Sequence, residues 1–277
     1  RWTLPNGLGT VYYDVQTATR ADGRVEVLIT RRIVRCSGEA APELYPADTL
    51  ARLAQRILRR QPALFGSAGP HNGVFALRAA LARRAVARGV ILAPDEVVVT
   101  HGGVEALNLA LRAVTQPGDV VAVESPCFYG LLQILETLGL RALEIPTSPQ
   151  TGISLEALQL AAAGPDPIRA LVVVPHLQNP LGCSMPDNHK AALVAWCNAE
   201  GIALIEDDSY GPLCVGSTLP RALKSWDATG NVLHCASLHK VLAPGLRLGW
   251  INGGRWHARV AMLKHAHTHF NEQLSQM

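Results

Sequence analysis

From Asp95 onward, short apolar segments alternate with segments of helical pattern, and this alternation constrains the fold more than any other feature of the sequence. We expect strands at residues 97–100, 120–124, 142–145, 170–174, 202–205, 232–236 and 246–251. We expect helices at residues 105–114, 128–138, 155–163 and 187–200, and Ser154 is the expected N-cap of the third. Strands that alternate with helices predict an α/β fold of three layers, with helices on both faces of a mostly parallel, seven-stranded sheet.

The residues before Asp95 have a less regular pattern. Residues 25–29 are a candidate strand, and a helix is expected to start with Asp48 as its N-cap. A loop rich in glycine and proline follows at residues 61–73. A second amphipathic helix is expected at residues 75–88. Its arginines are expected on a solvated face, opposite the apolar residues: Arg78, Arg83, Arg84 and Arg88.

Composition excludes several classes of protein. The net charge of +3 over 277 residues is too small to indicate nucleic-acid binding by itself. No apolar run reaches the length of a membrane span, and the first residues do not have the pattern of a signal peptide. The six cysteines are scattered and form no CxxC pair, so we expect reduced thiols in a cytoplasmic protein.

Glycines and polar residues follow several of the predicted strands, where an α/β sheet binds its ligands. Gly102 and Gly103 open a helix directly after a strand, so free N–H groups and the helix dipole favour a phosphate there. Asn179 precedes Pro180 and Gly182 in a tight turn, which gives its amide a defined direction. Each signal is weak alone, because glycines and asparagines are also common in ordinary turns.

Two charged residues make the pattern more specific. Asp207 follows an apolar strand, where a carboxylate requires a cationic partner such as a protonated pyridine nitrogen; a solvent-facing corner is the simpler alternative. Lys240 lies just after the strand at 232–236, with Ser237 before it and Arg247 after it. A partly desolvated lysine near other cations can form an imine with an aldehyde. An anion site, an acid partner for an aromatic ring and such a lysine together indicate a pyridoxal phosphate site.

Four motifs resemble the signature of the fold-type I, class I and II aminotransferases, and the resemblance extends from about Asp48 to the end of the chain. The motifs are Asn179-Pro180-Leu181-Gly182, Asp207-Asp208-Ser209-Tyr210, Ser237-Leu238-His239-Lys240 and the segment from Ala243 to Trp250. The resemblance implies the large domain of an aspartate aminotransferase-like, pyridoxal phosphate-dependent fold. It also implies catalytic roles for three residues, Lys240, Asp207 and Tyr210.

The same resemblance implies how the cofactor is held. Lys240 would form an internal aldimine and Asp207 would pair with the pyridine nitrogen. Asn179 and Tyr210 would donate hydrogen bonds to the phenolic oxygen, and Phe128 would stack on the ring. The phosphate site would comprise Ser237, Arg247, Gly102 and Gly103. Val104 and His239 occupy two positions where the family usually has a side chain with a hydroxyl or amide group, so backbone N–H groups would contribute more.

The sequence of residues 100–152, before these motifs, resembles the aminotransferase-like domain of the MocR-type branch of the GntR transcriptional regulators. This implies a homodimeric effector domain that binds pyridoxal phosphate and senses an amine or amino acid. DNA would be bound only by a winged helix-turn-helix outside these 277 residues, and the small carboxy-terminal domain would also lie outside them. We expect residues 1–74 to form an amino-terminal segment or dimer arm, and residues 75–277 to form the cofactor-binding large domain.

Two alternatives stay open from the sequence. One is an aminotransferase that transfers an amino group between an amino acid and a 2-oxo acid, and the other is a cofactor-free scaffold that only dimerises. No metal site is expected. His265 and His269 would share a helix face, but no carboxylate is well placed beside them, so the run from His265 to His269 is interpreted as a polar helix face.

Overall fold

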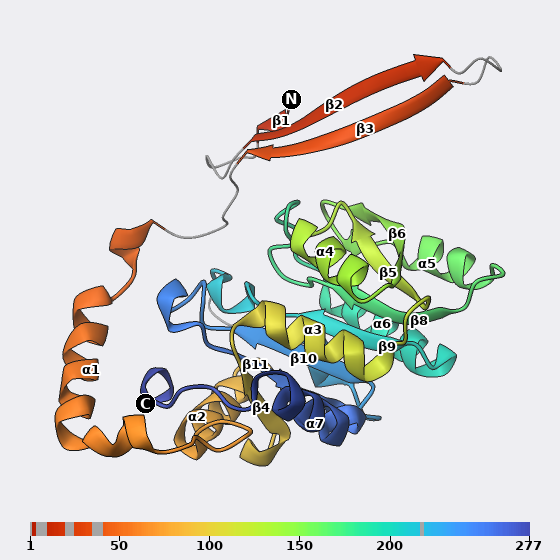
Figure 1. Cartoon of the computed structure of the whole chain (residues 1–277). Coiled ribbons are helices and arrows are strands. Elements are labelled where there is room, and N and C mark those ends of the chain that lie inside the picture. Colours follow the sequence, from red (N-terminus) through yellow and green to blue (C-terminus); the bar gives the residue numbers. More distant parts are fainter. Residues whose placement is uncertain (1, 4–9, 20–24, 35–40, 217–218) are drawn as a thin grey trace. The chain divides into compact units, whose positions relative to one another are not determined.

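The computed structural model describes residues 2–3, 10–19, 25–34, 41–216 and 219–277, and side chains from residue 41 onward (Figure 1). Its contacts divide the chain into two compact units, Arg1–Tyr45 and Pro46–Met277. The first unit has a three-stranded antiparallel sheet of β1 (Trp2–Thr3), β2 (Thr10–Thr19) and β3 (Val25–Val34). The strand expected at 25–29 therefore exists and is longer than predicted.

The second unit contains an eight-stranded sheet in the order β4-β11-β10-β9-β8-β5-β6-β7. The strands are β4 (Val97–Thr100), β5 (Val120–Ser125), β6 (Arg141–Ser148), β7 (Gly152–Ile153), β8 (Ile168–Val173), β9 (Ala203–Asp207), β10 (Val232–Ser237) and β11 (Gly249–Asn252). β6, β5, β8, β9 and β10 are parallel, whereas β11 is antiparallel to both of its neighbours, β10 and β4. All seven predicted strands are present, and the two-residue β7 is the addition.

Helices cover both faces of this sheet, as the alternation of elements predicted. Apolar residues of α3 (Gly103–Val114), α4 (Tyr129–Thr137) and α7 (His257–Thr268) form a core against one face. Residues of α5 (Leu155–Ala162) and α6 (Asp187–Glu200) form a second core against the other face. The three-layer α/β fold is thereby confirmed. Across the described part of the chain, each helix is too short or too polar to cross a membrane.

Two helices precede the sheet, and the predicted start of the first is wrong. α1 (Ala47–Arg60) has Pro46 at its N-cap, so Asp48 lies inside the first turn. Its negative charge there interacts favourably with the positive end of the helix dipole. α2 spans Phe75–Val86. The prediction for α5 is correct, because the Ser154 hydroxyl accepts a hydrogen bond from the backbone N–H of Ala157.

The last predicted strand also differs from the structure. Residues 246–251 were expected to be extended, but a 3₁₀ turn at η6 (Pro244–Leu246) comes first and β11 begins only at Gly249. Arg247 between them has a left-handed backbone with φ of +51°. A left-handed residue commonly ends a helical turn, and Arg247 separates η6 from the strand in this way.

Arg88 contradicts the expected solvated face. It lies just after α2, is only 5% exposed, and forms an ion pair of 3.0 Å with Asp208. The periodicity of the helix indicated which residues are polar. It contained no information about a carboxylate 120 residues away that would bring this arginine into the interior.

Candidate functional site

The strand register brings the predicted phosphate residues to one end of the sheet. In β11, Gly249 pairs with Thr100 of β4 on one side and with Ser237 of β10 on the other. A Cβ at Gly249 would lie 2.5 Å from the backbone carbonyl carbon of Gly102. The absence of a side chain at Gly249 therefore allows the start of α3 to approach β11 closely.

The amino-terminal end of α3 has the backbone donors that suit an anion. Gly102 is its N-cap, with a φ of +84° that favours glycine. The first N–H groups of an α-helix have no partner within the helix, so they are available to a ligand. A Cβ built at Gly103 would lie 3.3 Å from the Ser209 hydroxyl and 3.8 Å from that of Ser237. Two hydroxyl groups thus lie beside the helix end.

Arg247 adds a positive charge to the same place. Its Nη2 lies 2.9 Å from the Cβ position of Gly102 and donates to the carbonyl of His101 at 3.3 Å. Its Nη1 lies 2.9 Å from Nδ1 of His239. Because arginine has only donors, Nδ1 of His239 must accept this hydrogen bond. The exposed guanidinium is therefore held in place on two sides while it still faces solvent.

Val104 contributes only main-chain groups to this end of the site. Its side chain is 49% exposed, and it lies in the first turn of α3, where its N–H is one of the free donors. The described structure therefore brings together Gly102, Gly103, Val104, Ser237, Arg247 and His239. Their role in binding a phosphate stays a prediction.

Asp207 forms a chemically different end of the site. It is the last residue of β9, is 8% exposed, and pairs in register with Cys235 of β10. Its Oδ1 accepts hydrogen bonds from the backbone N–H of Ser209 at 3.1 Å and from the Ser209 hydroxyl at 2.6 Å. Burial raises the pKa of Asp207, although these hydrogen bonds oppose the shift. A cation placed against this carboxylate would stabilise its charged form.

Asn179 and Tyr210 are a second predicted group that the structure joins. The Asn179 amide donates to the Tyr210 hydroxyl at 3.5 Å. Burial raises the pKa of Tyr210 to about 12, and the charge of Asp207 acts in the same direction. The phenol is therefore protonated at neutral pH and can donate a hydrogen bond to an oxygen.

Lys240 and Phe128 lie in turns after two strands. Lys240 is half-buried in a turn after β10 that is closed by hydrogen bonds from Leu242 and Ala243 to the carbonyl of Leu238. Phe128 is the N-cap of α4, and its ring centroid lies 5.2 Å from that of Tyr129. The stacking role of Phe128 stays a prediction.

Sequence reasoning missed two residues that support the site. The Ser209 hydroxyl contacts Asp207 and also lies beside Gly103, so it connects the two ends. Glu105 accepts hydrogen bonds from the His101 N–H at 2.6 Å and from Lys264 at 2.9 Å. Burial would raise the pKa of Glu105, but hydrogen bonds from Thr268, His101 and Lys264 lower it to about 2. The charged Glu105 thereby fixes the chain that leads into α3.

A buried network supports β9 immediately beyond Asp207. Asp208 contacts Arg88 and His176, each at 3.0 Å, and His234 at 3.2 Å. Burial opposes the charge on Asp208, but the hydrogen bonds from both histidines and the charges of His234 and Arg88 lower its pKa. Nothing in the local sequence distinguished Asp208 from its neighbour Asp207.

Comparison with known proteins agrees with this geometry. The profile of the family described as aminotransferase class I and II matches residues 43–277. This chain belongs to the class I and II aminotransferase family. The resemblance and the fold expected from the sequence are thereby confirmed.

The relatives of this chain within the class I and II aminotransferase family include regulators and enzymes. It is 44% identical to two uncharacterized HTH-type transcriptional regulators of Escherichia coli, YjiR and YdcR. These matches cover 73% and 79% of this chain but only 43% and 46% of the regulators. It is 30% identical to the 2-aminoadipate transaminase of Thermus thermophilus, over 82% of this chain and 59% of the enzyme. The chain thus spans less than half the length of the two regulators.

Solved structures of family members have the same fold. An archaeal alanine:glyoxylate aminotransferase superposes with a TM-score of 0.82 at 29% identity, over 87% of this chain and 60% of the enzyme. The α-aminoadipate aminotransferase LysN of Thermus thermophilus, complexed with N-(5'-phosphopyridoxyl)-L-leucine, has a TM-score of 0.79 at 29% identity. That match covers 87% of this chain and 61% of LysN.

Proposed function

We propose that this chain is the pyridoxal phosphate-binding effector and dimerisation domain of a MocR-type transcriptional regulator of the GntR family. The observation that carries the proposal is the two-ended site. An anion-binding helix end lies beside Arg247, and a buried carboxylate lies on the strand next to the one that leads to Lys240. The regulator class is supported by the 44% identity to two HTH-type regulators.

The residues at the α3 end fit a phosphate group. The Gly102–Gly103 backbone is a cradle that a Cβ would fill, because Arg247 and the hydroxyls of Ser209 and Ser237 surround it. Free N–H groups, hydroxyls and a guanidinium are the donors that bind phosphate oxygens. Arg247 would add the charge-assisted hydrogen bonds, and the α3 dipole would stabilise the negative charge.

The residues at the Asp207 end fit a protonated pyridine ring. Asp207, whose pKa burial raises, would accept a hydrogen bond from a ring N–H and would become a stabilised anion in doing so. Tyr210 and Asn179 would donate to an oxygen on the ring. When bound, pyridoxal phosphate supplies an aldehyde that condenses with primary amines.

Lys240 is the residue that would link cofactor binding to ligand sensing. Its amine would bind the aldehyde covalently in the resting state, and the amine of a small ligand would take its place. The released Lys240 side chain, in the turn between β10 and η6, would then change the contacts of that turn. A switch of this kind needs one covalent exchange and no net chemical conversion of the ligand.

The wider setting is part of the same proposal. The protein would act as a cytoplasmic homodimer, and DNA would be bound by a helix-turn-helix domain outside this chain, as the class of its two regulator relatives suggests.

The alternative function is catalytic transamination between an amino acid and a 2-oxo acid, in which Lys240 would also move a proton. The identity to the 2-aminoadipate transaminase favours this second function.

Covalent labelling tests the cofactor assignment. The chain is mixed with pyridoxal phosphate, reduced with borohydride and digested, and the labelled lysine is found by mass spectrometry. We expect the label on Lys240, and we expect Lys240→Arg, which keeps the charge, to abolish both the label and the visible absorbance. Labelling mainly at Lys224 or Lys264 would refute the assignment.

A second experiment separates the sensor from the enzyme. The full-length protein is loaded with pyridoxal phosphate and given amino acids with and without 2-oxoglutarate. A sensor should change its absorbance and its affinity for DNA without sustained formation of a new amino acid. Continuous turnover with an unchanged affinity for DNA would favour the aminotransferase.

A further inference from the structure

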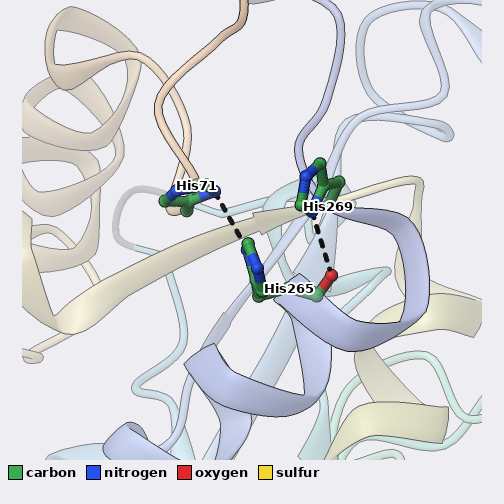
Figure 2. Close-up of side chains that lie close together, drawn as sticks. All are labelled: His71, His265 and His269. Carbon is green, nitrogen blue, oxygen red and sulfur yellow. Dashed lines mark hydrogen bonds between the residues drawn. The ribbon is translucent and has the colours of Figure 1, made fainter.

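Three histidines from two distant parts of the chain meet on the surface of the second unit (Figure 2). His71 lies in the loop before α2, His265 lies in the last turn of α7, and His269 follows the end of that helix. All three are exposed, and one ring nitrogen of each lies within 4.8 Å of the others. His71 and His265 are 194 residues apart in the sequence, which explains why the sequence suggested no third ligand.

The three rings form a compact group. Nδ1 of His265 lies 3.1 Å from Nδ1 of His71. Figure 2 marks this hydrogen bond with a dashed line. The ring centroids of His265 and His269 are 4.3 Å apart, and those of His71 and His265 are 4.5 Å apart. In a tetrahedral zinc site with Zn–N bonds of about 2.0–2.1 Å, two ligand nitrogens lie about 3.3 Å apart. The closest pair is therefore already near that separation.

The backbone at His269 is strained in a way that places its ring in the group. His269 has a φ of +66° and a ψ of −77°, which are the angles of a γ-turn. The hydrogen bond from the Phe270 N–H to the Thr268 carbonyl at 2.8 Å closes this turn. A non-glycine residue with such angles is rare and costs free energy, and strain of this kind clusters at functional sites.

Other contacts hold both segments in position. The amide of Gln273 donates to the Ser67 hydroxyl at 2.9 Å, and the Val99 N–H donates to the carbonyl of Asn72 at 3.0 Å. Next to His265, Lys264 is buried and contacts Glu105 and Thr268. The bond between Gln273 and Ser67 therefore joins the loop to the segment after α7 without the histidine rings. The other bonds anchor the loop to β4 and α7 to α3.

A second group of possible metal ligands is buried and already has hydrogen-bond and ion-pair partners. His176, Glu206 and Asp208 also lie close together, but they are buried. The Arg88 guanidinium contacts Asp208, and the N–H groups of Leu223 and Lys224 donate to Glu206. A cation there would displace an existing positive charge.

We propose that His71, His265 and His269 bind a divalent transition-metal ion through three imidazole nitrogens. Neutral imidazole is a ligand for Zn²⁺, Cu²⁺ and Ni²⁺, whereas Mg²⁺ and Ca²⁺ require oxygen ligands. Three protein ligands leave the fourth tetrahedral position to water or to another ligand. The ion would join the loop before α2 to the end of α7. This inference is independent of the proposed cofactor function.

Calorimetric titration of the chain with Zn²⁺ tests the site, in a buffer with a non-metal-binding reductant. The variants are His71→Ala, His265→Ala and His269→Asn; asparagine tolerates positive φ, so the last change removes the ring without adding backbone strain. His267→Ala is the matched control, because His267 is exposed on the same helix and contacts Glu105 instead of the other rings.

We expect one Zn²⁺ per wild-type chain, with unchanged binding in His267→Ala. Loss of a residue that only orients a ligand costs 10–100-fold in affinity, so each variant without a ligand should lose about 100-fold or more. Zn²⁺ should also raise the melting temperature of wild type and His267→Ala but not of the other three. Equal binding by all four variants, or equal losses in all four, would overturn the proposal. A triple variant that combines His71→Ala, His265→Ala and His269→Asn should bind no Zn²⁺ at this site. Unchanged binding by this triple variant would overturn the proposal as well, by assigning the ion to other groups.

Discussion

Substitution of Gly249 by alanine tests whether the close approach of β11 to the start of α3 forms the phosphate site. The added Cβ would lie 2.5 Å, 2.7 Å and 2.8 Å from the carbonyl carbon, oxygen and Cα of Gly102. These atoms belong to the backbone, so a side-chain rotation cannot relieve the clash. Non-bonded carbon atoms normally lie about 3.5 Å apart or more, and the helix start must therefore move by about 1 Å.

A displacement of that size changes ligand binding by a predictable amount. Hydrogen bonds from N–H groups to oxygen span about 2.7–3.2 Å, so a shift of about 1 Å breaks one of them. A hydrogen bond to a charged group contributes about 1.5–3 kcal/mol. Loss of one such bond should therefore weaken pyridoxal phosphate binding about tenfold or more.

The assay is a titration with pyridoxal phosphate followed by protein fluorescence and visible absorbance. Gly245→Ala is the control, because Gly245 lies in η6, just before β11, and a Cβ there meets no atom within 4 Å. Near-ultraviolet circular dichroism verifies that both variants are folded. If folded Gly249→Ala binds as tightly as Gly245→Ala, then the helix end is not part of the phosphate site.

Two further predictions concern buried charges. Arg88→Met leaves Asp208 without one of its partners, so it should reduce the free energy of unfolding by about 3 kcal/mol, as for other broken buried ion pairs. Urea unfolding should show this loss relative to the exposed Arg83→Met, and a second change, Asp208→Asn, should recover part of it. Burial raises the pKa of Glu124 to about 8, which exceeds its value in an unfolded chain, so stability should fall as pH rises from about 5 to 8. Glu124→Gln should flatten this decline in thermal melts, and an equally steep decline would contradict the burial argument.

The strands and the order of site residues along the chain could be predicted because they are encoded locally. Val97 to Thr100 and Val232 to Ser237 are apolar runs bounded by turn residues, and Lys240 follows such a run directly. Asp207 was expected at a strand end for the same reason. The structure shows it as the last residue of β9.

The remaining features depend on contacts between residues that are distant in the sequence. Arg88 was expected in solvent because helical periodicity reports polarity but not the location of a buried partner such as Asp208. The local sequence did not distinguish Glu105 from other acidic residues, because its partners Lys264 and Thr268 are distant in the sequence. Likewise, His71 lies in a loop whose sequence has no helical or strand periodicity. The fold places this loop beside α7, and only there does His71 meet His265.

The position of β11 between β4 and β10 has a consequence for the order in which the protein forms. β4 is the first strand of the eight-stranded sheet to leave the ribosome. Among the residues that the structure describes, its neighbour in that sheet is β11, which begins at Gly249. Pairing across so long a separation in sequence is entropically unfavourable and slow. The helix end that we assign to phosphate therefore gains its final support only after synthesis has passed residue 252. A nascent chain released earlier would have the apolar core strands but would lack a completed anion site.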